Sequence, residues 1–179
     1  PVVIKGTKNP IPVKYKENKG SAQCKSAVML AALNTKGKTI IKAKKSRNHS
    51  EILFKHLGIP IKIINTKKYD LIKIDGKKKI KSFNYKIPSD ISSAAFFIVL
   101  TALSKNSKLN IKNVNINPSR TGILKILKIM GVKILLKKIK NYKGEKTADI
   151  YIGSTDLIKS IKCPSNLNSA SIDEFLLIF

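Results

Sequence analysis

The sequence predicts a mixed α/β (α+β) fold built from a repeated helix-strand-helix-strand-strand unit. Two similarities between distant segments indicate the repeat: residues 32–42 resemble residues 102–112, and residues 46–58 resemble residues 119–131. The two offsets differ by three residues, which a longer loop in the second copy explains. Self-similarity at such a period is typical of a supersecondary unit that occurs more than once.

The first copy contains two predicted helices and three predicted strands. Small and apolar residues recur at helical spacing in the first helix, which Gly37 ends, and the second helix ends at Gly58. The strands are short apolar runs, bounded by polar turns. In chain order, the five elements are predicted at residues 22–34, 39–41, 47–57, 61–64 and 71–74.

The second copy repeats this order after a break at Pro88-Ser89-Asp90. Proline is poorly placed inside a strand and Ser or Asp is a good helix N-cap, so the break is either a loop between copies or a crossing between domains. The elements of this copy are predicted at residues 90–104, 108–113, 118–130, 132–136 and 149–152. A third copy begins with a predicted strand at residues 157–162 and a helix that starts near Asp173.

Composition favours a folded protein of the cytoplasm. The chain has 179 residues, of which 42 % are apolar and spread along its length, so it can bury a core. No apolar run approaches the roughly 20 residues that span a bilayer, and no signal peptide is recognisable. The chain starts at Pro1 in a strand-like run and stops at Phe179 in an apolar stretch, so we expect an internal fragment.

The net charge of +26 leaves a basic nucleic-acid-binding module as an alternative, because Lys and Arg neutralise phosphates. Of the 36 basic residues, however, 34 are Lys, and they are scattered among few aromatic residues. That pattern is unlike the stacking platform of a single-strand binder. Abundant Lys, Ile and Asn with almost no Arg indicates a codon bias towards A and T, and we expect no nucleic-acid partner.

The sequence predicts neither a metal site nor a disulfide framework. Cys24 and Cys163 lie far apart and form no CxxC pair. His49 and His56 are seven residues apart and belong to no recognisable ligand motif. We therefore expect no metal ligands.

Two segments of the first copy carry candidate anion-binding residues. Ser21-Ala22-Gln23 opens the first helix, whose free backbone N–H groups and partial positive charge suit a phosphate or carboxylate. The alternative is that Ser21 only caps this helix. Ser46-Arg47 precedes the second helix, and the planar fork of Arg fits oxyanions.

Two further candidates lie in the second half of the chain. Arg120 is the repeat partner of Arg47, and a capping or packing role is an equal alternative for it. Asp173 and Glu174 start an apolar helix, where acidic residues are common because of the helix dipole. A carboxylate that faces basic and amide donors can also act as a proton acceptor.

Taken together, five ordered blocks make the sequence resemble the EPSP synthases over its whole length. The blocks, which include Ser-Ala-Gln-x-Lys-Ser-Ala and Asn-Pro-Ser-Arg-Thr-Gly, lie at residues 21–27, 46–51, 89–97, 117–124 and 172–175. The resemblance implies the two-domain enolpyruvyl transferase fold, an inside-out α/β barrel with three copies of the unit in each domain. Residues 1–88 would end the first domain and residues 89–179 would begin the second, with a hinge near Pro88.

The resemblance also implies a reaction. In this family the enolpyruvyl group of phosphoenolpyruvate is transferred to the 5-hydroxyl of shikimate 3-phosphate, with release of phosphate, in the shikimate pathway of aromatic amino-acid biosynthesis. The reaction proceeds by addition and elimination through a tetrahedral intermediate. No metal or organic cofactor takes part, and we expect the full-length enzyme to be a monomer.

Carried over position by position, the resemblance assigns roles to six residues. Those expected to bind shikimate 3-phosphate are Ser21, Ala22, Gln23, Ser46, Arg47 and Asp173. Gln23 is also expected near phosphoenolpyruvate, and Asp173 is the expected proton acceptor. Ala22 replaces a second Ser of many members, and His49 stands where some members have Tyr. Residues 92–95, Ser-Ser-Ala-Ala, are expected to pack a helix through small side chains.

Several segments of the family pattern are not in this chain. These are the N-terminal Lys-Ser…Arg segment, the Gly-rich phosphoenolpyruvate loop, and the Lys/Glu/Arg segment downstream of Asp173. We therefore expect the chain alone to be inactive. The nearest alternative is a UDP-N-acetylglucosamine enolpyruvyl transferase, which shares the fold and reaction type but would lack the first and fourth blocks.

Overall fold

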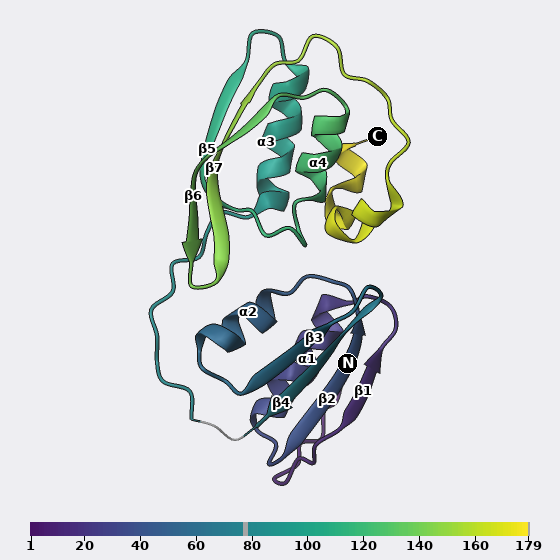
Figure 1. The fold of residues 1–179 in the computed structure, drawn as a ribbon, viewed down its shortest axis with the longest axis vertical. Helices are drawn as coiled ribbons and strands as arrows, with labels where there is room; N and C mark the ends of the chain where they lie inside the picture. Colours follow the sequence, from purple (N-terminus) through teal and green to yellow (C-terminus); the bar gives the residue numbers. More distant parts are fainter. Residues whose placement is uncertain (77–78, 179) are drawn as a thin grey trace. The chain divides into compact units, whose positions relative to one another are not determined.

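The computed structural model describes residues 1–76 and 79–178 of the chain. These residues form two compact units, Pro1–Phe83 and Asn84–Phe179. Each unit consists of one sheet with helices against it (Figure 1). The assignment of the units to the end of one domain and the beginning of another stays a prediction.

The first unit contains a four-stranded sheet in the order β1-β2-β4-β3. Strand β1 runs parallel to β2, and the other neighbours are antiparallel. The core lies between the sheet and the helices, where Ile41 and Ile72 pack with Met29 and Phe54. The elements are β1 (Lys14–Glu17), α1 (Ala22–Leu33), β2 (Lys38–Lys44), α2 (His49–His56), β3 (Ile61–Asn65) and β4 (Tyr69–Asp75).

The second unit repeats this topology in a sheet of order β5-β7-β6. Ser89 forms a parallel bridge with Val114 beside β5, the position that β1 occupies beside β2. The predicted repeat is therefore present twice, with a leading extended segment that the predicted unit did not include. The elements are α3 (Ile91–Leu103), β5 (Lys108–Asn115), α4 (Gly122–Ile129), β6 (Ile134–Tyr142) and β7 (Glu145–Gly153).

The end of the chain differs from the prediction. The expected strand at residues 157–162 is wrong, because this segment has no strand partner among the described residues. Its backbone N–H group at Lys159 bonds instead to the carbonyl of Met130 at the end of α4. The expected helix near Asp173 is a 3-10 helix, η2 (Ile172–Leu177), which follows η1 (Ser165–Ala170).

One side of α3 is apolar and exposed. Its four large side chains are each between 61 and 66 % exposed, and they are Phe96, Phe97, Leu100 and Leu103. The opposite side packs Ala95 and Ile98 into the core of the second unit. Within the described residues, no helix is both long enough and apolar enough to cross a membrane.

The sheet of the second unit is irregular on both sides of its central strand. The register of β5 against β7 shifts between Ile111 and Val114, and that of β6 shifts between Lys137 and Lys140. The buried carboxylate of Asp149 on β7 reaches both irregularities. It accepts a 2.9 Å hydrogen bond from the backbone N–H of Asn113 and lies 3.6 Å from the Lys138 ammonium.

Asn113 and Lys138 both have positive φ, at 52° and 51°. Residues other than glycine are strained in this region, so the bulges need a compensating interaction. Asp149 supplies it, because one carboxylate joins both bulges to the central strand.

We expect Asp149→Ala to destabilise the second unit by about 1–3 kcal/mol, because it removes the hydrogen-bond acceptor of the half-buried backbone N–H group of Asn113. Urea denaturation followed by circular dichroism measures the change. Asp156→Ala, at an exposed carboxylate beyond β7, is the matched control and should cost at most about 0.5 kcal/mol. Equal effects of the two substitutions would contradict the role given to Asp149.

Candidate functional site

Two side chains fix the start of α1. Ser21 is the N-cap residue, and its Oγ accepts a 3.2 Å hydrogen bond from the backbone N–H of Cys24. The buried carboxylate of Glu17 accepts 2.7 Å bonds from the backbone N–H groups of Lys19 and Gly20. Gly20 has a φ of +78°, a conformation that favours glycine. Hydrogen bonds to Glu17 before the turn and to Ser21 after it therefore fix the backbone that leads into α1.

These contacts also stabilise the charged form of Glu17. Burial alone would raise the pKa of this carboxyl group, but hydrogen bonds from the backbone of residues 19–21 and the nearby Lys44 ammonium outweigh burial and lower it. Glu17 therefore remains an acceptor for the turn at neutral pH.

A buried ion pair joins α1 to α2. Lys25 is completely buried, and its Nζ lies 2.6 Å from Oε1 of Glu51. The same Nζ donates a 2.8 Å hydrogen bond to the backbone carbonyl of Arg47. Next to this pair, the hydroxyls of Ser26 and Ser50 lie 2.7 Å apart. Lys25 therefore fixes the loop that leads into α2 as well as the helix itself.

This loop carries two of the predicted site residues. The Oγ of Ser46 is buried and has no hydrogen-bond partner among the described residues. Arg47 follows it and is half-buried. A Cβ at Gly20 would lie 3.5 Å from the carbonyl oxygen of Lys45, so the loops into α1 and α2 lie side by side. The structure thus brings Ser46 and Arg47 close to the start of α1.

The first turn of α1 holds the remaining candidates of this unit. Ala22 is half-buried and Gln23 is exposed. Backbone N–H groups at the amino end of a helix and an adjacent guanidinium are groups that bind phosphate or carboxylate. Residues 21–23 together with Ser46 and Arg47 therefore bring together groups suited to an anion, and their role as a binding site stays a prediction.

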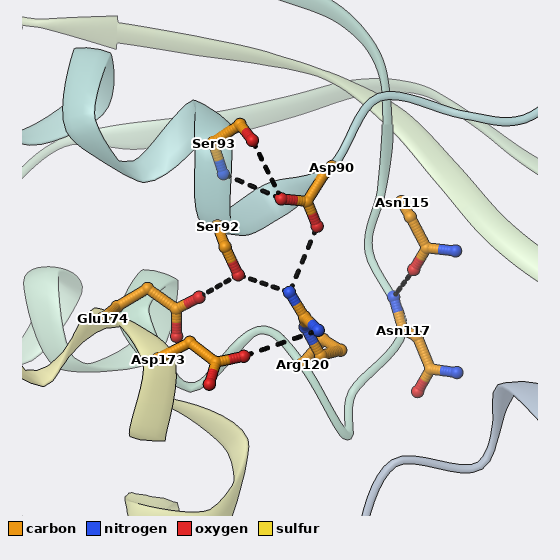
Figure 2. A network of polar contacts seen from close by, with 8 residues as sticks. All are labelled: Asp90, Ser92, Ser93, Asn115, Asn117, Arg120, Asp173 and Glu174. Carbon is orange, nitrogen blue, oxygen red and sulfur yellow. Dashed lines mark hydrogen bonds and ion pairs between the residues drawn. The ribbon is translucent and has the colours of Figure 1, made fainter. Parts of the chain in front are cut away.

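Asp173 lies in the second unit, within the polar network that Figure 2 shows. Its Oδ2 is 3.6 Å from Nη1 of Arg120, and its side chain is 45 % exposed. The adjacent Glu174 is buried and accepts a hydrogen bond from the hydroxyl of Ser92 on α3. The other guanidinium nitrogen of Arg120 contacts this hydroxyl and, at 3.1 Å, Oδ1 of Asp90.

Asp90 caps α3 in this network. Its Oδ2 accepts bonds from the backbone N–H of Ser93 at 2.9 Å and from the hydroxyl of Ser93 at 3.1 Å. Burial would raise the pKa of Asp90, but these bonds, the guanidinium of Arg120 and the backbone of Ser92 lower it overall. Asp90 is therefore a carboxylate beside Arg120 at neutral pH.

Asn117 and Gly122 place the loop that carries Arg120. The Oδ1 of Asn117 accepts from the backbone N–H of Ser119 at 2.9 Å, and its Nδ2 donates to Glu145 at 3.1 Å. A Cβ at Gly122 would lie 2.8 Å from atoms of Ala170 and Ser171. Only glycine permits this approach of α4 to the end of η1. These turns also explain why α4 begins at Gly122, later than predicted.

The roles predicted for the site residues stay predictions, but the structure adds contacts among them that the sequence did not indicate. Ala94 and Ala95 are buried as expected for small packing residues, whereas Ser92 belongs to the polar network. The ion pair between Arg120 and Asp173 was not predicted, although the scarcity of Arg in a Lys-rich chain marks Arg120 as unusual. Among the described residues, no group of three or more His, Cys, Asp or Glu side chains can hold a metal ion.

Proteins with similar sequences and structures point to one family. The family model for EPSP synthase (3-phosphoshikimate 1-carboxyvinyltransferase) matches residues 1–177. A 3-phosphoshikimate 1-carboxyvinyltransferase of Petrotoga mobilis is 42 % identical over 176 residues, which are 97 % of this chain and 40 % of that protein. One of Ruthia magnifica is 41 % identical over 180 residues, with 100 and 40 % coverage.

Solved structures agree with the sequence comparison. An EPSP synthase from Acinetobacter baumannii superposes with a TM-score of 0.82 and 34 % identity, over 96 % of this chain and 38 % of that one. This similarity confirms the predicted fold class. The chain spans about two fifths of the length of the curated relatives that it matches.

We expect Lys25→Met to destabilise the first unit by about 3–5 kcal/mol, because it leaves the buried Glu51 carboxylate without its partner. The double substitution Lys25→Met/Glu51→Leu removes both charges and should recover most of this loss. Urea denaturation of both variants measures the difference, with Lys55→Met at an exposed position of α2 as the control. A double variant as unstable as the single one would contradict this account.

The pKa of Glu17 predicts a pH dependence of stability. Because the pKa of Glu17 in the folded protein lies below the ordinary value of about 4.5, its contribution to stability is fully present above about pH 4.5 and is lost as the pH falls through the folded pKa. Unfolding free energies measured from pH 7 to pH 3 should therefore fall more steeply in the unsubstituted protein than in Glu17→Gln. Parallel curves would show that Glu17 makes no such contribution.

Proposed function

Because this chain belongs to the EPSP synthase family, we propose that the protein containing it transfers the enolpyruvyl group of phosphoenolpyruvate to the 5-hydroxyl of shikimate 3-phosphate. The 5-oxygen forms a bond to C2 of phosphoenolpyruvate while C3 gains a proton. Loss of phosphate from C2 and of a proton from C3 then gives 5-enolpyruvylshikimate 3-phosphate.

The observation that carries this proposal is the buried, unpartnered hydroxyl of Ser46. A buried hydroxyl without a hydrogen bond is costly, and a ligand that accepts its proton removes the cost. The hydroxyl belongs to a loop beside the start of α1 and next to Arg47. A phosphate ester with oxygens at this position can accept from Ser46, from a guanidinium and from helix N–H groups.

The substrate contacts proposed for this chain follow from these positions. Shikimate 3-phosphate is bound by the first turn of α1, by the loop into α2 and by Asp173, and Gln23 also contacts phosphoenolpyruvate. Asp173 accepts the proton of the 5-hydroxyl as the new bond forms, because a half-exposed carboxylate can both contact a ligand and receive its proton. The high positive charge of the chain attracts both anionic substrates.

We further propose that the complete protein acts in the cytoplasm as a monomer, without a metal or organic cofactor and without a nucleic-acid partner. Its small-molecule substrates are those of the family. The resemblance in five ordered blocks supports these points.

The proposal predicts distinct kinetic effects of two substitutions in the complete protein. Asp173→Asn should lower kcat by about 10²–10⁴-fold, the usual range for loss of a proton acceptor. Ser46→Ala should raise KM for shikimate 3-phosphate by roughly 10-fold with a small change in kcat, as expected for one hydrogen bond to a charged group. Phosphate release from both substrates is measured at steady state.

Ser82→Ala, at an exposed serine of the first unit, is the matched control and should leave both parameters unchanged. A complete, folded protein that releases no phosphate from the two substrates would refute the proposed reaction. Release that depends on UDP-N-acetylglucosamine would instead identify the related transferase.

A further inference from the structure

Arg120 connects its own loop to two other segments of the second unit. Its Nη2 contacts Asp90, the N-cap of α3, and the hydroxyl of Ser92 in the first turn of that helix. Its Nη1 faces Asp173 of η2 at 3.6 Å. Figure 2 shows the guanidinium between these groups, with the carboxylate of Asp173 directed towards it. The arginine side chain itself is only 17 % exposed.

The two carboxylates of the Asp173-Glu174 pair are held in different ways. Glu174 is 2 % exposed and accepts a hydrogen bond from Ser92, so this buried contact links η2 to α3. Asp173 is half-exposed, and its carboxylate lies beside Nη1 of Arg120. The hydroxyl of Ser92 therefore links the two carboxylates, since it donates to Glu174 and contacts Arg120, which faces Asp173.

Anchoring Arg120 to α3 does not account for its contact with Asp173. Asp90 and Ser92 already bind Nη2 and anchor Arg120 to α3, whereas Nη1 is directed at the carboxylate of Asp173 on η2. The planar fork of Arg presents two nitrogens in fixed, different directions, whereas the ammonium of Lys is one compact charge on a flexible stem. This chain has 34 Lys among its 36 basic residues and has Arg here.

We propose that Arg120 is a positioning residue for Asp173: anchored on Asp90 and Ser92, it orients the Asp173 carboxylate and keeps a positive charge beside it. This inference rests on the proposed function, in which Asp173 accepts the proton of the substrate hydroxyl. Arg120 itself touches no substrate in this account. It acts by holding the acceptor oxygen in the geometry that proton transfer requires.

Steady-state kinetics of the complete protein test this role. Arg120→Gln should lower kcat by roughly 10- to 100-fold, because a misplaced catalytic group slows the chemical step. KM for shikimate 3-phosphate should change by less than about 3-fold, since the contacts proposed for α1 and for the loop into α2 remain. Guanidinium added at millimolar concentration should restore part of the activity of Arg120→Ala, because it replaces the lost group.

Lys125→Gln, on the exposed side of α4, is the matched control. An Arg120→Gln protein with unchanged kcat overturns the proposal. The proposal is also overturned if Arg120→Gln is only less stable. In that case its kcat is unchanged at a temperature where it is folded, and guanidinium does not restore activity to Arg120→Ala.

A second measurement is independent of the reaction. With every native Cys replaced by Ser, Asp173→Cys places a thiol at the position of the carboxylate. The ratio of its alkylation rates by anionic iodoacetate and neutral iodoacetamide reports the local charge. Arg120→Gln should lower this ratio by about five-fold, the attraction between unit charges roughly 4 Å apart in water.

The two experiments separate the possible failures. If the complete protein does not catalyse the proposed reaction while the alkylation ratio falls as expected, the proposed function fails and the placement of Arg120 stands. If the ratio is the same with and without Arg120, the guanidinium does not face position 173 and the inference is overturned.

Discussion

The burial of one face of each small sheet beneath two helices is the constraint on which the rest of this structure depends. A short sheet of three or four strands has a stable core only when apolar residues on one face are covered. Covering that face with α1 and α2, or with α3 and α4, fixes where the loops into these helices lie. The residues proposed to act on substrates lie in those loops or beside them.

The two copies meet this constraint with different chemistry at one pair of positions. By the offsets of the repeat, Lys25 and Glu51 of the first copy correspond to Ala95 and Leu124 of the second, which are 0 and 5 % exposed. The fold therefore does not require an ion pair here, and buried ion pairs seldom add stability over apolar residues. The pair in the first copy supplies something else, a donor that holds the carbonyl of Arg47.

Regular elements could be predicted because their periodicity is local. Helices α1 and α3 and strands β2 to β7 were predicted from apolar spacing. Their ends differ from the prediction by at most four residues, except that β6 ends at Tyr142 and not at residue 136. Strand β1 was not predicted, since of its four residues only Glu17 is buried. The strand predicted at residues 157–162 was wrong because apolar spacing does not reveal whether a pairing partner is present.

The candidate site was predictable as a set of residues but not as an arrangement. Family resemblance pointed to Ser46, Arg47 and Asp173, and helix-start chemistry pointed to Ser21. The contact between Arg120 and Asp173 joins residues distant in the chain, and the orphaned hydroxyl of Ser46 is defined by what surrounds it. Neither feature has a local sequence pattern, so both emerge only from tertiary packing.

The requirement for glycine at position 122 also limits how this sequence can evolve. Its composition indicates mutational drift towards A- and T-rich codons, which replaces many residues by Lys, Asn or Ile. At Gly122 any such replacement would place a Cβ within 3 Å of the backbone of Ala170. Selection must therefore retain a codon that mutation disfavours, and Gly122 should remain fixed in lineages where the surface around it becomes steadily richer in lysine.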